Sequence, residues 1–100
     1  MRQYLIRSAM INGFKCRKTE LLFNGGRVAA FSGFKRQAEK RLRILDAANT
    51  IEVLKALPSN RFESLSGDRK GQFSIRVNQQ WRVCFRWDEG AYDVEIVDYH

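Results

Sequence analysis

The sequence predicts an α+β protein in which N-terminal helices pack on one face of a small, mainly antiparallel β-sheet. Two observations lead to this expectation. Apolar residues recur every three or four positions before Pro58, whereas after Pro58 they alternate with polar residues. A length of 100 residues suits one compact core. We therefore expect residues 10–100 to form a single domain.

The segment before the main helix contains two short elements. The apolar stretch Met10–Cys16 favours a first strand, and TELLFNGG favours a helical turn that Gly25 and Gly26 stop. Residues 1–9 match no element. We expect them to be an N-terminal extension that is disordered, or misannotated if the natural start is Met10.

The clearest helical pattern runs from Phe31 to Ala48. Its apolar residues follow helical spacing and form one stripe: Phe31, Phe34, Ala38, Leu42, Leu45 and Ala48. The other face is basic, with Lys35, Arg36, Lys40 and Arg43. This face is expected to be solvated, or to meet RNA phosphate or an acidic partner segment. A second, short helix follows in NTIEVLKAL, with Thr50 as N-cap and Pro58 at its end.

Strands are predicted after Pro58. RFESL is a candidate strand, and QFSIRV and WRVCFRW both alternate apolar with polar residues. Asn78, Gln79 and Gln80 form a tight connection between the last two, and WDEGA supplies a second turn through Gly90. The segment YDVEIVDYH is the final strand.

Charge and cysteine content narrow the function classes. Lys and Arg number 18 against 11 Asp and Glu, which gives a net charge of +7 and favours an anionic partner such as nucleic acid or an acidic protein. No apolar run could cross a membrane, and the N-terminus fails as a secretory signal, so we expect a cytoplasmic protein. Cys16 and Cys84 have no metal-ligand spacing, which argues against zinc; Cys84 is expected to be part-buried.

Arginines crowd the two central strands. If the apolar residues face the helices, then Arg76, Arg82 and Arg86 emerge together on the opposite face. Guanidinium groups suit phosphate oxygens and stack on bases. The same arginines could instead pair with Asp93, Glu95 or Asp98 of the last strand. The pattern alone leaves both interpretations open.

The string LSGDRKGQFSIRVNQQWRVCFRW, followed by DVEIVDYH at the C-terminus, resembles the HigB toxins of type II toxin-antitoxin systems, within the RelE-like superfamily. The resemblance extends from residue 10 to residue 100. It implies a RelE-like fold and a ribosome-dependent endoribonuclease that cuts mRNA in the A site of the 70S ribosome. It also implies that a HigA-type antitoxin, a helix-turn-helix protein, neutralises the toxin. The toxin would contact operator DNA only through this antitoxin. No metal or organic cofactor is implied.

The resemblance also suggests the site residues. Asp98, Tyr99 and His100 match terminal positions that the family uses at its active site, and a histidine is a suitable proton carrier at neutral pH. Arg76 and Arg82 match basic positions, and we expect Arg82 to stabilise the transition state. The residues expected to hold the RNA backbone are Arg69, Lys70 and Arg86.

The sequence departs from the family pattern before GDR. Glu63 stands where some members have histidine, and Ser66 stands where they have lysine. Glutamate can serve as a general base, but serine cannot replace the positive charge, so weaker cleavage is expected. The alternative is a non-catalytic basic module that binds an antitoxin or ribosomal RNA without cutting. Sequence-specific DNA binding by the isolated chain has the least support, because no helix-turn-helix pattern is visible.

Overall fold

The second half of the chain forms an antiparallel sheet with its strands in sequence order. The computed structural model describes residues 10–98. Its strands are β1 (Glu63–Ser64), β2 (Phe73–Arg76), β3 (Arg82–Trp87) and β4 (Ala91–Val97). Asn78 closes the β2–β3 connection, because its side-chain oxygen accepts hydrogen bonds from the backbone N–H groups of Gln80 and Trp81, both at 2.8 Å. Between β3 and β4 the N–H of Asp88 donates to the carbonyl of Gly90 at 2.9 Å, so both predicted turns are confirmed.

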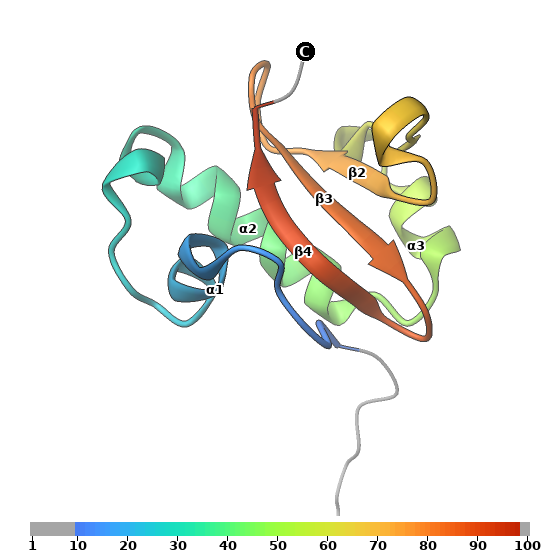
Figure 1. Ribbon diagram of the computed structural model, residues 1–100, viewed down its shortest axis with the longest axis horizontal. Coiled ribbons are helices and arrows are strands. Elements are labelled where there is room, and N and C mark those ends of the chain that lie inside the picture. Colours follow the sequence, from blue (N-terminus) through green and yellow to red (C-terminus); the bar gives the residue numbers. More distant parts are fainter. Residues whose placement is uncertain (1–9, 99–100) are drawn as a thin grey trace, which may run out of the picture.

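The helices precede this sheet in the chain. They are α1 (Arg17–Phe23), α2 (Lys35–Ala47) and α3 (Ile51–Ala56), with 3₁₀ turns η1 (Ala29–Phe34) and η2 (Pro58–Asn60). A further 3₁₀ turn, η3 (Gly67–Arg69), lies between β1 and β2. In Figure 1, α2 crosses behind β3 and β4, and α1 lies beside β4. The α+β prediction, with helices on one face of the sheet, is confirmed.

The core lies between α2 and the sheet. The predicted apolar stripe is buried throughout, from Phe31 in η1 to Ala48 just after α2. From the sheet, Ile75, Val83 and Phe85 are fully buried against it. Thr50 caps α3 as predicted, with its hydroxyl accepting a hydrogen bond from the backbone N–H of Val53. Burial of these apolar side chains is the main stabilising term.

The predicted strand at Met10–Cys16 is wrong. This segment runs beside β4 but makes a single parallel bridge there, between Phe14 and Val94. Regular pairing fails because β4 is bent at Asp93, whose φ of 52° is incompatible with an extended ladder. In addition, the N–H of Ile11 donates to the side chain of Asp46 instead of to a strand. The expectation for residues 1–9 lies outside the described residues.

The second face of the sheet is less open than the alternating pattern predicts. Ser74 and Cys84 both lie on this face, yet both are fully buried. They are opposite each other in the β2–β3 register, and Arg82 and Arg69 extend over them. The expectation that Cys84 is only part-buried is therefore wrong, because long side chains cover the strand. Within residues 10–98, none of the helices combines the length and the hydropathy that crossing a bilayer requires.

Candidate active site

A pocket of about 360 Å³ opens beside the β2–β3 connection. Its walls come from β1 and the residue after η2 on one side, and from the β2–β3 hairpin on the other. The lining residues are Arg61, Glu63, Arg76, Asn78, Gln79, Gln80 and Arg82. Three of these are arginines and one is a carboxylate, so the pocket carries a net positive charge and suits an anionic ligand.

Arg82 is the most firmly held arginine of the pocket. Its Nε donates to Ser74 Oγ at 2.7 Å, and Nη2 donates to the backbone carbonyl of Arg61. Its side chain is only 14% exposed. Among the described residues, Nη1 makes no hydrogen bond or ion pair, so two N–H groups of a fixed guanidinium are left for a ligand.

Arg76 and Arg82 are brought together, as the sequence predicts. The two residues are directly opposite each other in the β2–β3 register. Arg76 Nε donates to the carbonyl of Asn78 at 3.1 Å, which turns the side chain toward the hairpin connection. Neither of its terminal nitrogens has a partner within the described part of the chain. The two arginines therefore present unused donors to one pocket.

Glu63 lies at the same pocket, close to Arg82. Its Oε1 is 3.9 Å from Arg82 Nε, and its side chain is 54% exposed. An ion pair at this distance and exposure contributes little stability. The carboxylate remains accessible to water and to a bound ligand.

The C-terminal end of β4 leads to the rim of the pocket. Val97, the last residue of β4, is opposite Arg82 in the β3–β4 register. The next residue, Asp98, accepts a hydrogen bond at 2.8 Å from the side-chain amide of Gln80, which lines the pocket. Asp98 is thus brought to the predicted site. Tyr99 and His100 lie outside the described residues.

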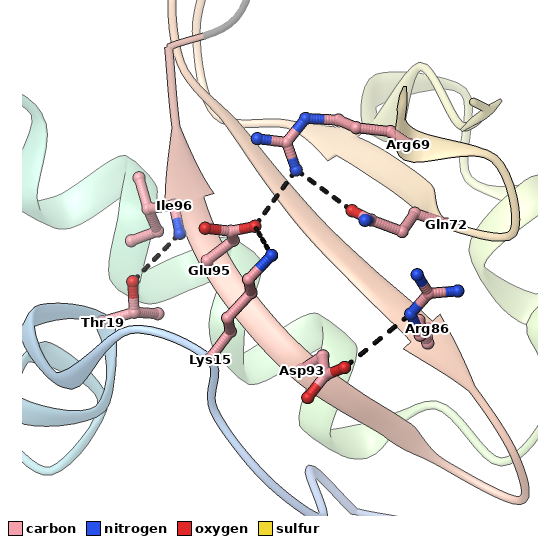
Figure 2. Close-up of polar contacts among 8 residues, drawn as sticks. All are labelled: Lys15, Thr19, Arg69, Gln72, Arg86, Asp93, Glu95 and Ile96. Atoms are coloured by element: carbon pink, nitrogen blue, oxygen red, sulfur yellow. Dashed lines mark hydrogen bonds and ion pairs between the residues drawn. The ribbon is translucent and has the colours of Figure 1, made fainter. Parts of the chain in front are cut away.

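Arg69 and Arg86 do not line this pocket. Figure 2 shows that both are turned toward β4: Arg69 Nη1 is 3.1 Å from Glu95, and Arg86 Nε is 3.7 Å from Asp93. Arg86 is four residues from Arg82, about 13 Å along the strand. Arg69 and Arg86 therefore pair with carboxylates of the last strand, β4.

The neighbourhood of Glu95 is a small charge network. Glu95 also forms an ion pair with Lys15 at 3.7 Å, and Arg69 donates a second hydrogen bond to the side chain of Gln72 at 3.1 Å (Figure 2). Lys70 follows Arg69 in the chain and is exposed. Glu95 therefore neutralises part of the positive charge on this surface.

Two arginines near the pocket were missed by sequence reasoning. Arg61 has a left-handed backbone with φ of 45°, and its carbonyl receives Arg82. Arg41, on α2, lies beside Arg76; burial and the nearby Arg76 charge lower the pKa of Arg41 below its usual value. The available signal for Arg41 was its position next to Leu42, at the edge of the apolar stripe. No local pattern marks Arg61.

Other polar chemistry in the described residues is limited. Among residues 10–98, no group of three or more His, Cys, Asp or Glu side chains is placed to hold a metal ion. Burial raises the pKa of the Cys84 thiol to about 11, so this thiol is neutral at physiological pH. A neutral, buried thiol is a poor nucleophile.

Comparison with known proteins agrees with the resemblance noted in the sequence. A family model described as "RelE-like toxin of type II toxin-antitoxin system HigB" matches residues 25–100. Toxin HigB-1 of Vibrio cholerae serotype O1 is 46% identical over 61 residues, which cover 61% of this chain and 64% of that relative. Endoribonuclease HigB of Proteus vulgaris is 35% identical over 96 residues, which cover 91% of this chain and all of that relative.

A solved structure confirms the fold. A chain of the YoeB-YefM complex from Staphylococcus aureus superposes with a TM-score of 0.52, covering 96% of this chain and 99% of that chain. The sequence identity is 14%, so this likeness bears on the fold alone. The family match over residues 25–100 and the 35% identity over the full length of the Proteus vulgaris relative identify the chain as a member of the HigB family of RelE-like toxins from type II toxin-antitoxin systems.

Proposed function

We propose that this protein is an endoribonuclease that cuts mRNA in the A site of the ribosome and thereby inhibits translation. The observation that carries the proposal is the pocket in which Arg76 and Arg82 present unused donors beside Asp98 and Glu63. The Proteus vulgaris relative, named as an endoribonuclease and aligned over its whole length, supports the same activity.

The reaction needs three chemical roles. The 2′-oxygen of the message attacks the adjacent phosphorus, so one proton leaves the nucleophile, another reaches the departing 5′-oxygen, and negative charge builds on the phosphorane. Arg82 suits the charge-stabilising role, because its position is fixed before substrate arrives. Arg76, with two terminal nitrogens available, suits binding of the scissile phosphate.

Proton transfer is assigned to the carboxylates and the C-terminal residues. Glu63 can accept a proton at the pocket wall, and His100 can carry one near neutral pH. Tyr99 and His100 are assigned roles here because they match the family's terminal site positions and directly follow Asp98 in the chain. In this proposal Asp98 orients His100, and Tyr99 stacks on a base or orients the 2′-hydroxyl.

The remaining predicted residues belong to binding rather than chemistry. Arg69, Lys70 and Arg86 are proposed to contact the RNA or ribosomal RNA backbone from the surface beside the pocket. Ser66 has no charge and does not line the pocket. Phosphate stabilisation therefore depends on the arginines, which is consistent with weaker cleavage than in lysine-containing relatives.

The partners are proposed from family membership. A HigA-type antitoxin would neutralise the protein and link it to operator DNA, and the YoeB-YefM complex from Staphylococcus aureus, which shares the fold, supports an antitoxin partner in general. The net charge of +7 favours binding to the 70S ribosome and its message. Cytoplasmic location and metal-independent cleavage complete the proposal.

The test is translation-coupled cleavage. Purified protein is added to 70S ribosomes paused on a defined mRNA in buffer containing magnesium, and to the same mRNA without ribosomes. Cuts at A-site codons only in the ribosomal reaction are expected, and His100→Ala should abolish them. Uncut mRNA in both reactions would refute the proposal.

The same experiment separates the alternative function. A non-catalytic module that binds ribosomal RNA would stop protein synthesis while the mRNA remains full length. The absence of a charge at Ser66 is the observation that favours this alternative. Measuring peptide synthesis and mRNA length in one reaction distinguishes the two.

A further inference from the structure

A second hollow adjoins the candidate active-site pocket. It has a volume of about 440 Å³ and lies between α2, η2 and the β2–β3 connection. It shares Arg61, Arg76, Asn78 and Gln79 with the first pocket and adds Arg41 from α2. The two hollows therefore form neighbouring compartments with Arg76 in their common wall.

This second hollow concentrates positive charge. Arg41, Arg61 and Arg76 all line it, and among the described residues no carboxylate oxygen lies within 4.0 Å of their guanidinium nitrogens. The Arg76 charge lowers the pKa of Arg41, which reflects repulsion between the two groups. A bound anion would relieve this repulsion.

Arg41 is held in place by a buried anchor. Its Nη1 donates to Asn60 Oδ1 at 2.7 Å and to Ser59 Oγ at 3.3 Å. Asn60 is fully buried, and its amide donates to the carbonyl of Leu54 at 3.0 Å, which fixes the position of the acceptor. A guanidinium that is already oriented loses less entropy when it binds a ligand.

Arg43 offers a contrast on the same helix. It is exposed, and it makes no hydrogen bond or ion pair within the described part of the chain. The two residues carry the same charge and lie two positions apart in α2. On α2, the arginine that lines the hollow is therefore anchored, whereas Arg43 is not.

We propose that this second hollow binds the backbone phosphate of the RNA that neighbours the scissile phosphate. Arg41 binds only this neighbouring phosphate, whereas Arg76 contacts both this phosphate and the scissile phosphate. The proposal rests on the proposed function for the identity of the scissile site. Two adjoining compartments that share Arg76 suit two successive phosphates of one RNA strand, because every nucleotide of the strand carries a phosphate, whereas the carboxylates of a protein partner have no such fixed order.

The first test measures RNA binding without cleavage. The probe is an mRNA with a 2′-deoxy nucleotide at the cleavage position of the A-site codon, held on paused 70S ribosomes, and binding of the full chain is measured over a series of salt concentrations. Arg41→Gln should weaken binding about tenfold and reduce the slope of log K against log salt by about 0.7. The matched control Arg43→Gln should leave both quantities close to those of the wild type.

The second test locates the phosphate. In a series of RNA probes, a neutral methylphosphonate replaces one phosphate at a time, and each probe is combined with wild-type protein and with Arg41→Gln. The losses of binding free energy caused by the methylphosphonate and by Arg41→Gln should be non-additive at only one position, next to the scissile phosphate. Arg61→Gln, whose side chain makes no hydrogen bond or ion pair within the described residues, should weaken binding even if Arg41→Gln folds poorly.

The outcomes are distinct from those of the cleavage assay. Additive effects at every phosphate, or equal behaviour of Arg41→Gln and Arg43→Gln, would overturn the second phosphate site while leaving cleavage intact. A wild-type protein that cuts no message would overturn the proposed function. In that case the comparison of Arg41→Gln with Arg43→Gln still tests whether the second hollow binds an RNA phosphate, because the probe cannot be cut.

Discussion

Removing the Ser74 hydroxyl should loosen Arg82 at a cost that the structure allows us to estimate. Ser74 is fully buried, and its Oγ accepts the 2.7 Å hydrogen bond from Arg82 Nε. Hydrogen bonds to charged groups contribute about 1.5–3 kcal/mol. Because the Arg82 side chain is 14% exposed and water can partly replace the lost acceptor, we expect Ser74→Ala to lower the free energy of unfolding by about 1.5 kcal/mol.

The same change should slow cleavage through Arg82. The guanidinium would keep its contact with the carbonyl of Arg61 but lose the one that fixes Nε. We expect the single-turnover rate of mRNA cleavage on saturating ribosomes to fall about tenfold, equivalent to about 1.4 kcal/mol of barrier. The assays are urea unfolding and single-turnover cleavage.

Two controls make this prediction refutable. Ser64→Ala removes an exposed serine from the neighbouring strand and should change the unfolding free energy by less than about 0.5 kcal/mol. In an Arg82→Gln background, Ser74→Ala should cost less than in the wild type, because the charged donor is gone. Equal costs in both backgrounds would show that the Ser74–Arg82 contact carries no stability, and would refute the reasoning.

Two further predictions concern buried groups. The Cys84 thiol keeps its proton up to about pH 11 when folded but ionises near pH 9 when unfolded, so stability should fall as pH rises from 9 to 11. In urea unfolding, the free energy of unfolding of Cys84→Ala should fall between pH 9 and pH 11 by up to about 2.7 kcal/mol less than that of the wild type. Parallel pH profiles for the two proteins would contradict a raised pKa for Cys84. Thr19→Val removes the acceptor, at 2.9 Å, for the buried N–H of Ile96 and should cost about 1–3 kcal/mol, whereas Thr19→Ser should cost much less.

The fold was largely predictable because its periodicities are strong. The helical stripe from Phe31 to Ala48 and the alternation in β2 and β3 reflect simple burial on one face. The error at Met10–Cys16 has a non-local cause: whether that segment could pair depended on the bend at Asp93, about eighty residues away in the chain. Apolar composition alone does not report such a bend.

The candidate site was predictable in part. Opposed arginines in a tight hairpin place Arg76 and Arg82 together whatever the rest of the fold does. In contrast, the choice between phosphate and carboxylate partners depended on tertiary geometry. Arg86 on β3 lies 3.7 Å from Asp93 of the neighbouring strand β4, whereas Arg76 is on β2, which is not adjacent to β4. Arg41 reaches the second hollow only through tertiary packing, and its one local signal, the position next to Leu42 at the edge of the apolar stripe, does not indicate a site residue.

The central claim is that the pocket beside Arg82, and not basic charge in general, cuts the message. It is tested most directly by comparing Arg82→Gln with Arg86→Gln, which remove the same charge from the same strand. The measurement is the single-turnover rate of A-site mRNA cleavage on saturating ribosomes. We expect about a hundredfold loss for Arg82→Gln, the usual cost of removing one transition-state donor, and a change of less than about threefold for Arg86→Gln. Equal losses for the two variants would contradict it.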